Sequence, residues 1–144
     1  MDLLRFLVGQ PIVGLEARMM GAAPGVAIRQ DKMTLLLDFA DGSTGAVHYL
    51  ANGSKAFPKE RVEVFCGRQI AILDDFVSLQ TIKDGKKKET KGAQNKGWVD
   101  EWKFFAKAIR EGGQPPIPYE QLIGVTKATF AAMESLQTGN RVLI

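Results

Sequence analysis

The only histidine of this chain is the first residue that could do chemistry, and a polar segment follows it. Tyr49 comes directly after His48, and Asn52 opens a loop that continues to Lys55. An imidazole acts as a general base when a pocket and an orienting partner surround it. The favoured interpretation is a strand histidine that packs or hydrogen-bonds beside Leu35. The alternative is a substrate-facing role, in which His48, Tyr49 and Asn52 line the substrate.

Other candidate catalytic residues fit structural roles better. Asp74 and Asp75 could work as paired carboxylates, but a turn between two strands explains them more simply. Cys66 precedes Gly67, and no second histidine exists to activate its thiol, so we expect a small buried turn residue. One histidine, one cysteine and scattered carboxylates show no metal-ligand spacing, and we predict no metal site.

Five lysines lie within nine residues, at Lys83, Lys86, Lys87, Lys88 and Lys91. No aromatic residue interleaves with them, so the base stacking of single-strand nucleic-acid binding is not expected. The favoured interpretation is a solvated hairpin tip with a tight turn at Asp84-Gly85, whose lysines discourage edge pairing. The alternative is a surface that binds an acidic partner.

The composition describes an ordinary soluble domain. The chain has 144 residues, 45% hydrophobic and 24% charged, which predicts one domain over residues 1–144. The net charge of +3 comes from the lysine cluster, because charges elsewhere nearly balance. No apolar run approaches the roughly 18 residues of a membrane span, and the N-terminus is a poor signal peptide. With a single cysteine, we expect a reducing, cytoplasmic compartment and no membrane partner.

The elements that must position these residues centre on a hairpin over residues 33–50. Asp41-Gly42 predicts a two-residue turn, which places His48 opposite Leu35. Both surfaces of this hairpin carry apolar side chains, so we expect the middle of a sheet that is covered on both sides.

Strands precede helices along the rest of the chain. Further strands are predicted over residues 12–20, 61–66, 69–73, 76–82, 86–90 and 141–144, and helices over 2–8, 98–111 and 119–138. This order predicts an α+β fold with an open, mostly antiparallel β-sheet. The helices pack on one face, and the other face is available for oligomerisation, most simply with a second copy of the same sheet.

The two long helices carry the side chains that would cover the sheet. Trp98 and Trp102 begin an apolar stripe and are predicted to anchor the core. In the last helix, a stripe that includes Leu122 and Met133 lies beside alanines that allow close packing, namely Ala128, Ala131 and Ala132. The helix over residues 2–8 is short and has no capping residue before it. It is either a docked piece or the end of a longer helix.

Four stretches together resemble the C-terminal domain of the Gfo/Idh/MocA oxidoreductases, the family of glucose–fructose oxidoreductase and inositol dehydrogenase. They are DLLRFLVGQPI at 2–12, DFADGSTGAVHYLANGS at 38–54, RVEVFCGRQIAILDD at 61–75, and the helix pair with ESLQTGNRVLI at 134–144. Each pattern is moderately specific, but their order covers nearly the whole chain. The stretch WVDEWKFFAKAIREGGQPPIPYEQL is similar to members associated with sugar or cell-surface polysaccharide genes.

The resemblance implies a substrate-binding and oligomerisation domain of a sugar- or cyclitol-type dehydrogenase. Family members pair such a domain with an N-terminal Rossmann domain that binds NAD or NADP. They form dimers or tetramers through the sheet. Hydride passes between the nicotinamide and a carbon that bears a hydroxyl or a carbonyl.

The sequence departs from the family pattern at its start. The Rossmann domain is absent, and the family's catalytic histidine lies three residues before the aspartate that Asp2 matches, where only Met1 precedes. We therefore expect a fragment that holds no cofactor and is inactive alone, with NAD or NADP implied for its full-length parent. The rival expectation is a standalone homodimeric interaction module that pairs through its sheet and has no enzymatic activity.

Overall fold

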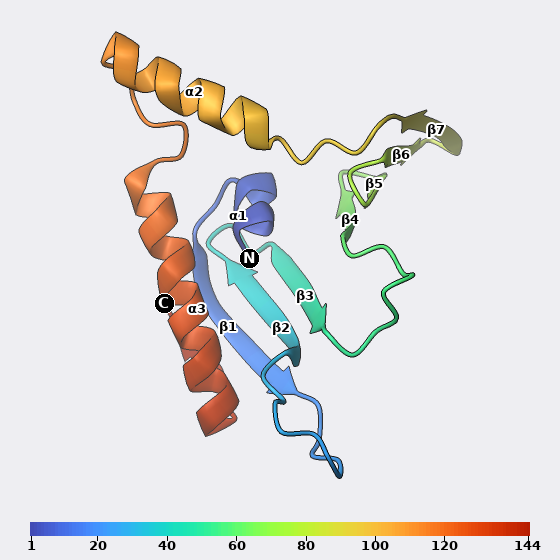
Figure 1. The fold of residues 1–144 in the computed structure, drawn as a ribbon, viewed down its shortest axis with the longest axis vertical. Helices are drawn as coiled ribbons and strands as arrows, with labels where there is room; N and C mark the ends of the chain where they lie inside the picture. Colours follow the sequence, from blue (N-terminus) through green and yellow to red (C-terminus); the bar gives the residue numbers. More distant parts are fainter. The chain divides into compact units, whose positions relative to one another are not determined.

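The computed structural model of the chain describes residues 1–144, which form two compact units. The first unit comprises Met1–Asn52 and Gln114–Ile144, and the second comprises Gly53–Gly113. Each unit contains its own antiparallel sheet of four strands (Figure 1). None of the helices combines the length and the apolar character that a membrane span requires.

The first unit carries its helices on one face of its sheet. The strands lie in the order β3 (Thr44–Leu50), β2 (Lys32–Phe39), β1 (Ile12–Met19) and β8 (Val142–Leu143). Helix α3 (Tyr119–Thr138) packs along β1, and the short helix α1 (Asp2–Val8) contacts α3 (Figure 1). No helix of this unit lies on the opposite face, which we call the open face.

The core of the first unit lies between the sheet and α3. The strands contribute large side chains such as Leu15, Leu37 and Phe39 to this core. The helix contributes small ones, since Ala128, Ala131, Ala132 and Ser135 are its buried residues. The predicted close packing of the alanines is therefore confirmed. The predicted stripe is wrong in part, because Leu122 and Met133 are exposed rather than buried, with 45% and 42% of their surfaces exposed. The large strand side chains leave room only for the alanine face of the helix.

The central hairpin forms, but its predicted register is wrong by one residue. His48 lies opposite Thr34, and Val47 lies opposite Leu35. The loop has three residues, in which the N–H of Gly42 donates to the carbonyl oxygen of Phe39 at 3.0 Å. Gly42 has a φ of +86°, which is typical of a type I turn that ends in a left-handed residue.

The shift of one residue changes which side chains share a face. Leu35 and Leu37 are buried on the helix side, where Val47 is partly buried, whereas His48 and Ala46 join Thr34 and Leu36 on the open face. Both surfaces of the hairpin carry apolar side chains, as predicted, but on the open face Leu36 and Ala46 lie among polar groups. That a partner covers this face stays a prediction.

The second unit has a sheet with β4 (Arg61–Cys66), β5 (Gln69–Asp74), β6 (Ser78–Lys83) and β7 (Lys86–Lys91) in chain order. Two-residue turns connect β4 to β5 and β6 to β7. Asp84 and Gly85 both have positive φ, as the predicted tight turn requires. Helix α2 (Trp98–Glu111) ends at Gly112, which adopts a left-handed conformation.

Two predictions about the second unit are wrong. Helix α2 buries none of its residues, and Trp98 and Trp102 are each 70% exposed rather than core anchors. Its amphipathic stripe exists, but no element of its own unit covers it. Cys66 forms part of the predicted turn region, but it is exposed rather than buried, because no layer covers the end of β4.

The predicted α+β class, with open antiparallel sheet and helices on one face, is confirmed. The strands are divided between two sheets of four rather than forming one continuous sheet. The assignment of all 144 residues to one domain stays a prediction.

Candidate functional site

The open face of the first unit carries His48, one of the three residues that the sequence associated with a substrate, among other polar side chains. Alternation along β1, β2 and β3 places Glu16, Thr34, Asp38 and His48 on this face. Leu36 lies among them with 56% of its surface exposed. The face is therefore a mixed polar surface around an apolar centre, which suits either a hydroxylated ligand or another protein surface.

His48 is paired across the hairpin with a hydroxyl. Its Nδ1 lies 3.0 Å from Oγ1 of Thr34, and this contact is exposed. The favoured interpretation of a hydrogen-bonded strand histidine fits this contact, although its neighbour is Thr34 rather than Leu35. The contact fixes the orientation of the ring and leaves Nε2 free to bond a ligand hydroxyl.

Tyr49 and Asn52 do not lie beside His48 on the same surface. Tyr49 is opposite Met33 and points to the other side of the sheet, with 55% of its surface exposed. Asn52 follows β3 in a turn, and its Nδ2 donates to Sδ of Met20 at 3.6 Å. The three residues share one end of β3 but do not converge, so their common role in substrate binding stays a prediction.

An ion pair that the sequence pattern did not indicate joins the end of the chain to β2. Nε of Arg141 donates to Oδ2 of Asp38 at 2.8 Å. The guanidinium crosses Gly14, where an added Cβ would lie 2.7 Å from Nη2. Gly14 thus leaves the space through which the arginine reaches β2. A separation of 103 residues hides this pair from any local pattern.

A second ion pair, between Arg18 and Glu16, occupies the same face at 2.7 Å. Both pairs are partly exposed, so each contributes about 1 kcal/mol of stability or less. These charged groups could also bind a polyol, because carboxylates accept hydrogen bonds from its hydroxyls and guanidinium groups donate hydrogen bonds to them.

The paired aspartates of the second unit are structural, as expected. Asp75 and Phe76 have positive φ in the turn after β5. The carboxylate of Asp74 accepts a hydrogen bond from Nη1 of Arg61 at 2.7 Å, rather than bonding the local backbone. The hydrogen bonds that Arg61 donates to Glu63, together with the charge of Asp74, raise the pKa of Arg61. No catalytic carboxylate pair forms here.

A hollow of about 410 Å³ lies in the second unit beside Glu60. Oε1 of Glu60 pairs with Nζ of Lys96 at 2.9 Å, and this hydrogen bond lowers the pKa of the glutamate. Oε2 is buried and has no hydrogen-bond partner. The pair fastens the segment before α2 to the segment before β4, a link that the sequence pattern did not indicate.

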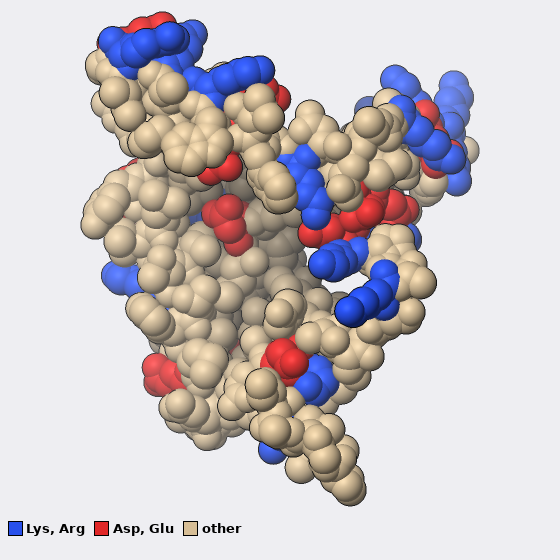
Figure 2. Space-filling model, viewed as in Figure 1, with Lys and Arg blue, Asp and Glu red and all other residues tan.

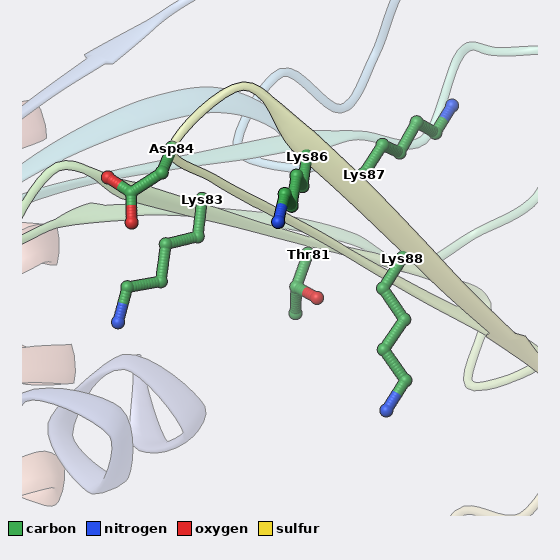
Figure 3. A pocket seen from close by; sticks show the side chains of 6 residues that line it. All are labelled: Thr81, Lys83, Asp84, Lys86, Lys87 and Lys88. Carbon is green, nitrogen blue, oxygen red and sulfur yellow. The ribbon is translucent and has the colours of Figure 1, made fainter.

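The lysine cluster forms the exposed β6–β7 hairpin, as predicted. Figure 2 shows basic side chains gathered on the part of the surface that this hairpin occupies. A shallow hollow of about 290 Å³ lies against it, lined by Thr81, Lys83, Asp84, Lys86, Lys87 and Lys88 (Figure 3). All six residues of β7 are exposed.

The residues present do not fit a dinucleotide of the Rossmann type. Such a site needs parallel strands and a glycine-rich turn from a strand into a helix. Every strand pair of both sheets is antiparallel, and no strand runs directly into a helix through such a turn. No group of three His, Cys, Asp or Glu residues is placed to hold a metal ion.

The fold matches solved oxidoreductases over nearly the whole chain. The NADH complex of levoglucosan dehydrogenase with levoglucosan matches with a TM-score of 0.82 and 19% identity, over 99% of this chain and 47% of that one. An Agrobacterium radiobacter oxidoreductase, in complex with NAD⁺, L-tartaric acid and magnesium, matches at 0.78 and 20%, over 99% and 46%. The aldose-aldose oxidoreductase of Caulobacter crescentus matches at 0.77 and 15%, over 99% and 44%.

These solved structures are oxidoreductases of the Gfo/Idh/MocA type, and the fold expected from the sequence resemblance is thereby confirmed. No family model and no curated protein sequence matches the chain. The chain spans about half the length of the solved structures. At this level of identity the similarity establishes the fold, and the chemistry has to be argued from the residues.

Proposed function

We propose that this chain is the substrate-binding and oligomerisation half of an NAD(P)-dependent dehydrogenase that acts on a sugar or a cyclitol. The observation that carries the proposal is the fold match over 94–99% of the chain to oxidoreductases whose own chains are about twice as long. Among those proteins are a levoglucosan dehydrogenase and a UDP-N-acetylglucosamine 3-dehydrogenase.

The proposed division of labour follows from the chemistry of the groups. A bound nicotinamide dinucleotide supplies hydride transfer, and this chain's elements do not fit such a cofactor. A dinucleotide-binding domain, in the same or another polypeptide, therefore completes the active site. His48, Tyr49 and Asn52 offer an imidazole, a phenol and an amide, which hydrogen-bond sugar hydroxyls and orient the ring.

The open face of the first unit is proposed to join subunits into a dimer or tetramer. Support comes from exposed Leu36 and Ala46 at the centre of a face on which the unit places no helix. Apolar groups at the centre of a polar rim are typical of protein interfaces. The same surface would serve the rival function, a homodimeric module without enzymatic activity.

A direct assay tests the proposed inactivity of the isolated chain. The purified 144-residue protein is mixed with NAD or NADP and a panel of aldoses and cyclitols, and formation of the reduced cofactor is followed by its absorbance. We expect no turnover above the enzyme-free rate, because no element of the chain fits the hydride acceptor. Turnover that copurifies with the chain and saturates with a sugar would overturn the proposed inactivity.

A further inference from the structure

The β6–β7 hairpin ends the sheet of the second unit with an open edge. The sheet order is β4-β5-β6-β7, so no strand lies beyond β7. The N–H of Gly92 donates to the carbonyl oxygen of Val77, and Lys86 pairs with Lys83 around a two-residue turn. Antiparallel pairs alternate between hydrogen-bonded and non-hydrogen-bonded positions. The backbone groups of Lys87, Glu89 and Lys91 therefore point outward from the edge.

The side chains along this edge carry a net positive charge that nothing neutralises. Lys83, Lys86, Lys87 and Lys88 make none of the ion pairs of the structure, and Glu89 pairs only with Lys91, at 3.3 Å. Figure 3 shows Lys83 and Lys88 extending to the same side as Thr81, while Lys87 extends to the other side. Lys86 shares the Thr81 side by its register.

We infer that the β7 edge binds an extended acidic peptide segment of a partner protein, which adds to the sheet as a fifth strand. The outward backbone groups of Lys87, Glu89 and Lys91 supply the main-chain hydrogen bonds. The ammonium groups of Lys86 and Lys88 pair with alternate carboxylates of the added strand, and Lys83 borders the same hollow. This surface is independent of the proposed dehydrogenase function.

Geometry and charge select this partner over the alternatives. Alternate side chains of an added strand repeat at about 6.8 Å, which is also the repeat of Lys86 and Lys88 along β7. Pairing with a second β7 would place lysines against lysines, which is unfavourable. Single-stranded nucleic acid uses aromatic stacking, and the hairpin from Ser78 to Lys91 contains no aromatic residue.

The test measures the binding of an end-blocked, eight-residue peptide of alternating Glu and Thr to the full chain. A Lys/Thr peptide of equal length is the control ligand. We expect only the Glu/Thr peptide to bind, with an affinity that falls as salt is raised. The double variant K86E/K88E is expected to bind at least tenfold more weakly. K107E/K127E makes the same change in net charge at exposed helix positions, and it should stay within about twofold of the native chain.

A proline at position 89 separates strand addition from attraction by charge alone. E89P removes an outward N–H and a negative charge without removing a hydrogen bond to β6. We expect the Glu/Thr peptide to bind at least fivefold more weakly, although the edge becomes more positive. Binding of E89P that equals or exceeds native binding would overturn the inference, as would equal affinity for both peptides.

Amide hydrogen exchange supplies a second measurement on the unaltered chain. Exchange of the amides of Lys87, Glu89 and Lys91 should slow at least tenfold when the Glu/Thr peptide is saturating. Unchanged exchange at these positions would overturn strand addition, even if the peptide binds. Tighter binding of a DNA oligonucleotide or polyphosphate than of the peptide would overturn the choice of partner.

Discussion

At the scale of single residues, Ser135 replaces a missing strand partner beside β1. Strand β8 pairs only with Gly14 and Leu15, so the N–H of Ala17 lies beyond it. Oγ of Ser135 accepts a hydrogen bond from that N–H at 2.9 Å and donates to the carbonyl oxygen of Asn140 at 2.5 Å. One fully buried hydroxyl thereby joins α3, β1 and the segment that leads into β8.

Removal of this hydroxyl is expected to destabilise the first unit. S135A leaves the buried N–H of Ala17 without an acceptor, and a lost buried partner costs about 1–3 kcal/mol. The free energy of unfolding is measured by urea denaturation monitored by circular dichroism. T138A is the matched control, because Thr138 is exposed and bonds only within the helix and its end. T138A should change stability by less than about 0.5 kcal/mol. Equal stabilities of S135A and the native chain would contradict the proposed role.

The sequence could identify candidate site residues by their residue type, but it could not identify the residues that surround them in the fold. His48 stood out as the only histidine, and its place on a strand was readable from the alternation around it. Its partner Thr34 and the Asp38–Arg141 pair were not readable. The pairing of His48 with Thr34 depends on the strand register, which shifts when the loop gains one residue. The Asp38–Arg141 pair joins positions 103 residues apart.

At the scale of elements, the open face of the first unit is the surface most changed by the observed register. A two-residue loop would have aligned His48 with Leu35, whereas the observed loop places His48 beside Thr34. The local pattern Asp-Gly fits either loop, since the glycine has positive φ in both cases. The side chain of Asp41 favours the observed loop, because its Oδ1 accepts a hydrogen bond from the N–H of Ser43 at 3.0 Å.

A charge placed on the open face should prevent self-association of the chain. L36E puts a carboxylate at the exposed apolar centre of that face, where burial against a second sheet is unfavourable. We expect the native chain to sediment as a dimer or larger species, and the variant to associate at least tenfold more weakly. F130E makes the same kind of change at the exposed side of α3 and should associate as the native chain does. A native chain that stays monomeric at high concentration would contradict association through this face.

Element bounds were more predictable than element partners. The helices α2 and α3 begin and end where the sequence placed them, because glycines follow both and the apolar periodicity is long. The pattern also showed that α2 is amphipathic, but an amphipathic stripe does not identify what covers it. Trp98 and Trp102 have the spacing of core residues, but both are exposed in the structure.

At the scale of the whole molecule, the two units carry different candidate binding surfaces. The first unit holds the core, the open face and the residues proposed to contact substrate. The second unit has no fully buried side chain and carries the lysine-rich β7 edge. The sequence resemblance predicted the fold over nearly the full length, because its motifs occur in the family's order. It did not predict the division into two sheets, because the residues of a strand do not show which sheet that strand joins.

A hybrid enzyme tests whether this chain can supply the substrate-binding half of a sugar dehydrogenase. The chain is joined to the dinucleotide-binding half of levoglucosan dehydrogenase, and formation of NADH is measured with a panel of sugars and cyclitols. The hybrid's binding of NADH, followed by fluorescence, confirms that the attached half is folded. We expect sugar-dependent turnover by the hybrid and none by either half alone. A hybrid that is folded and binds NADH, but reduces no cofactor with any member of the panel, would contradict the proposed dehydrogenase function.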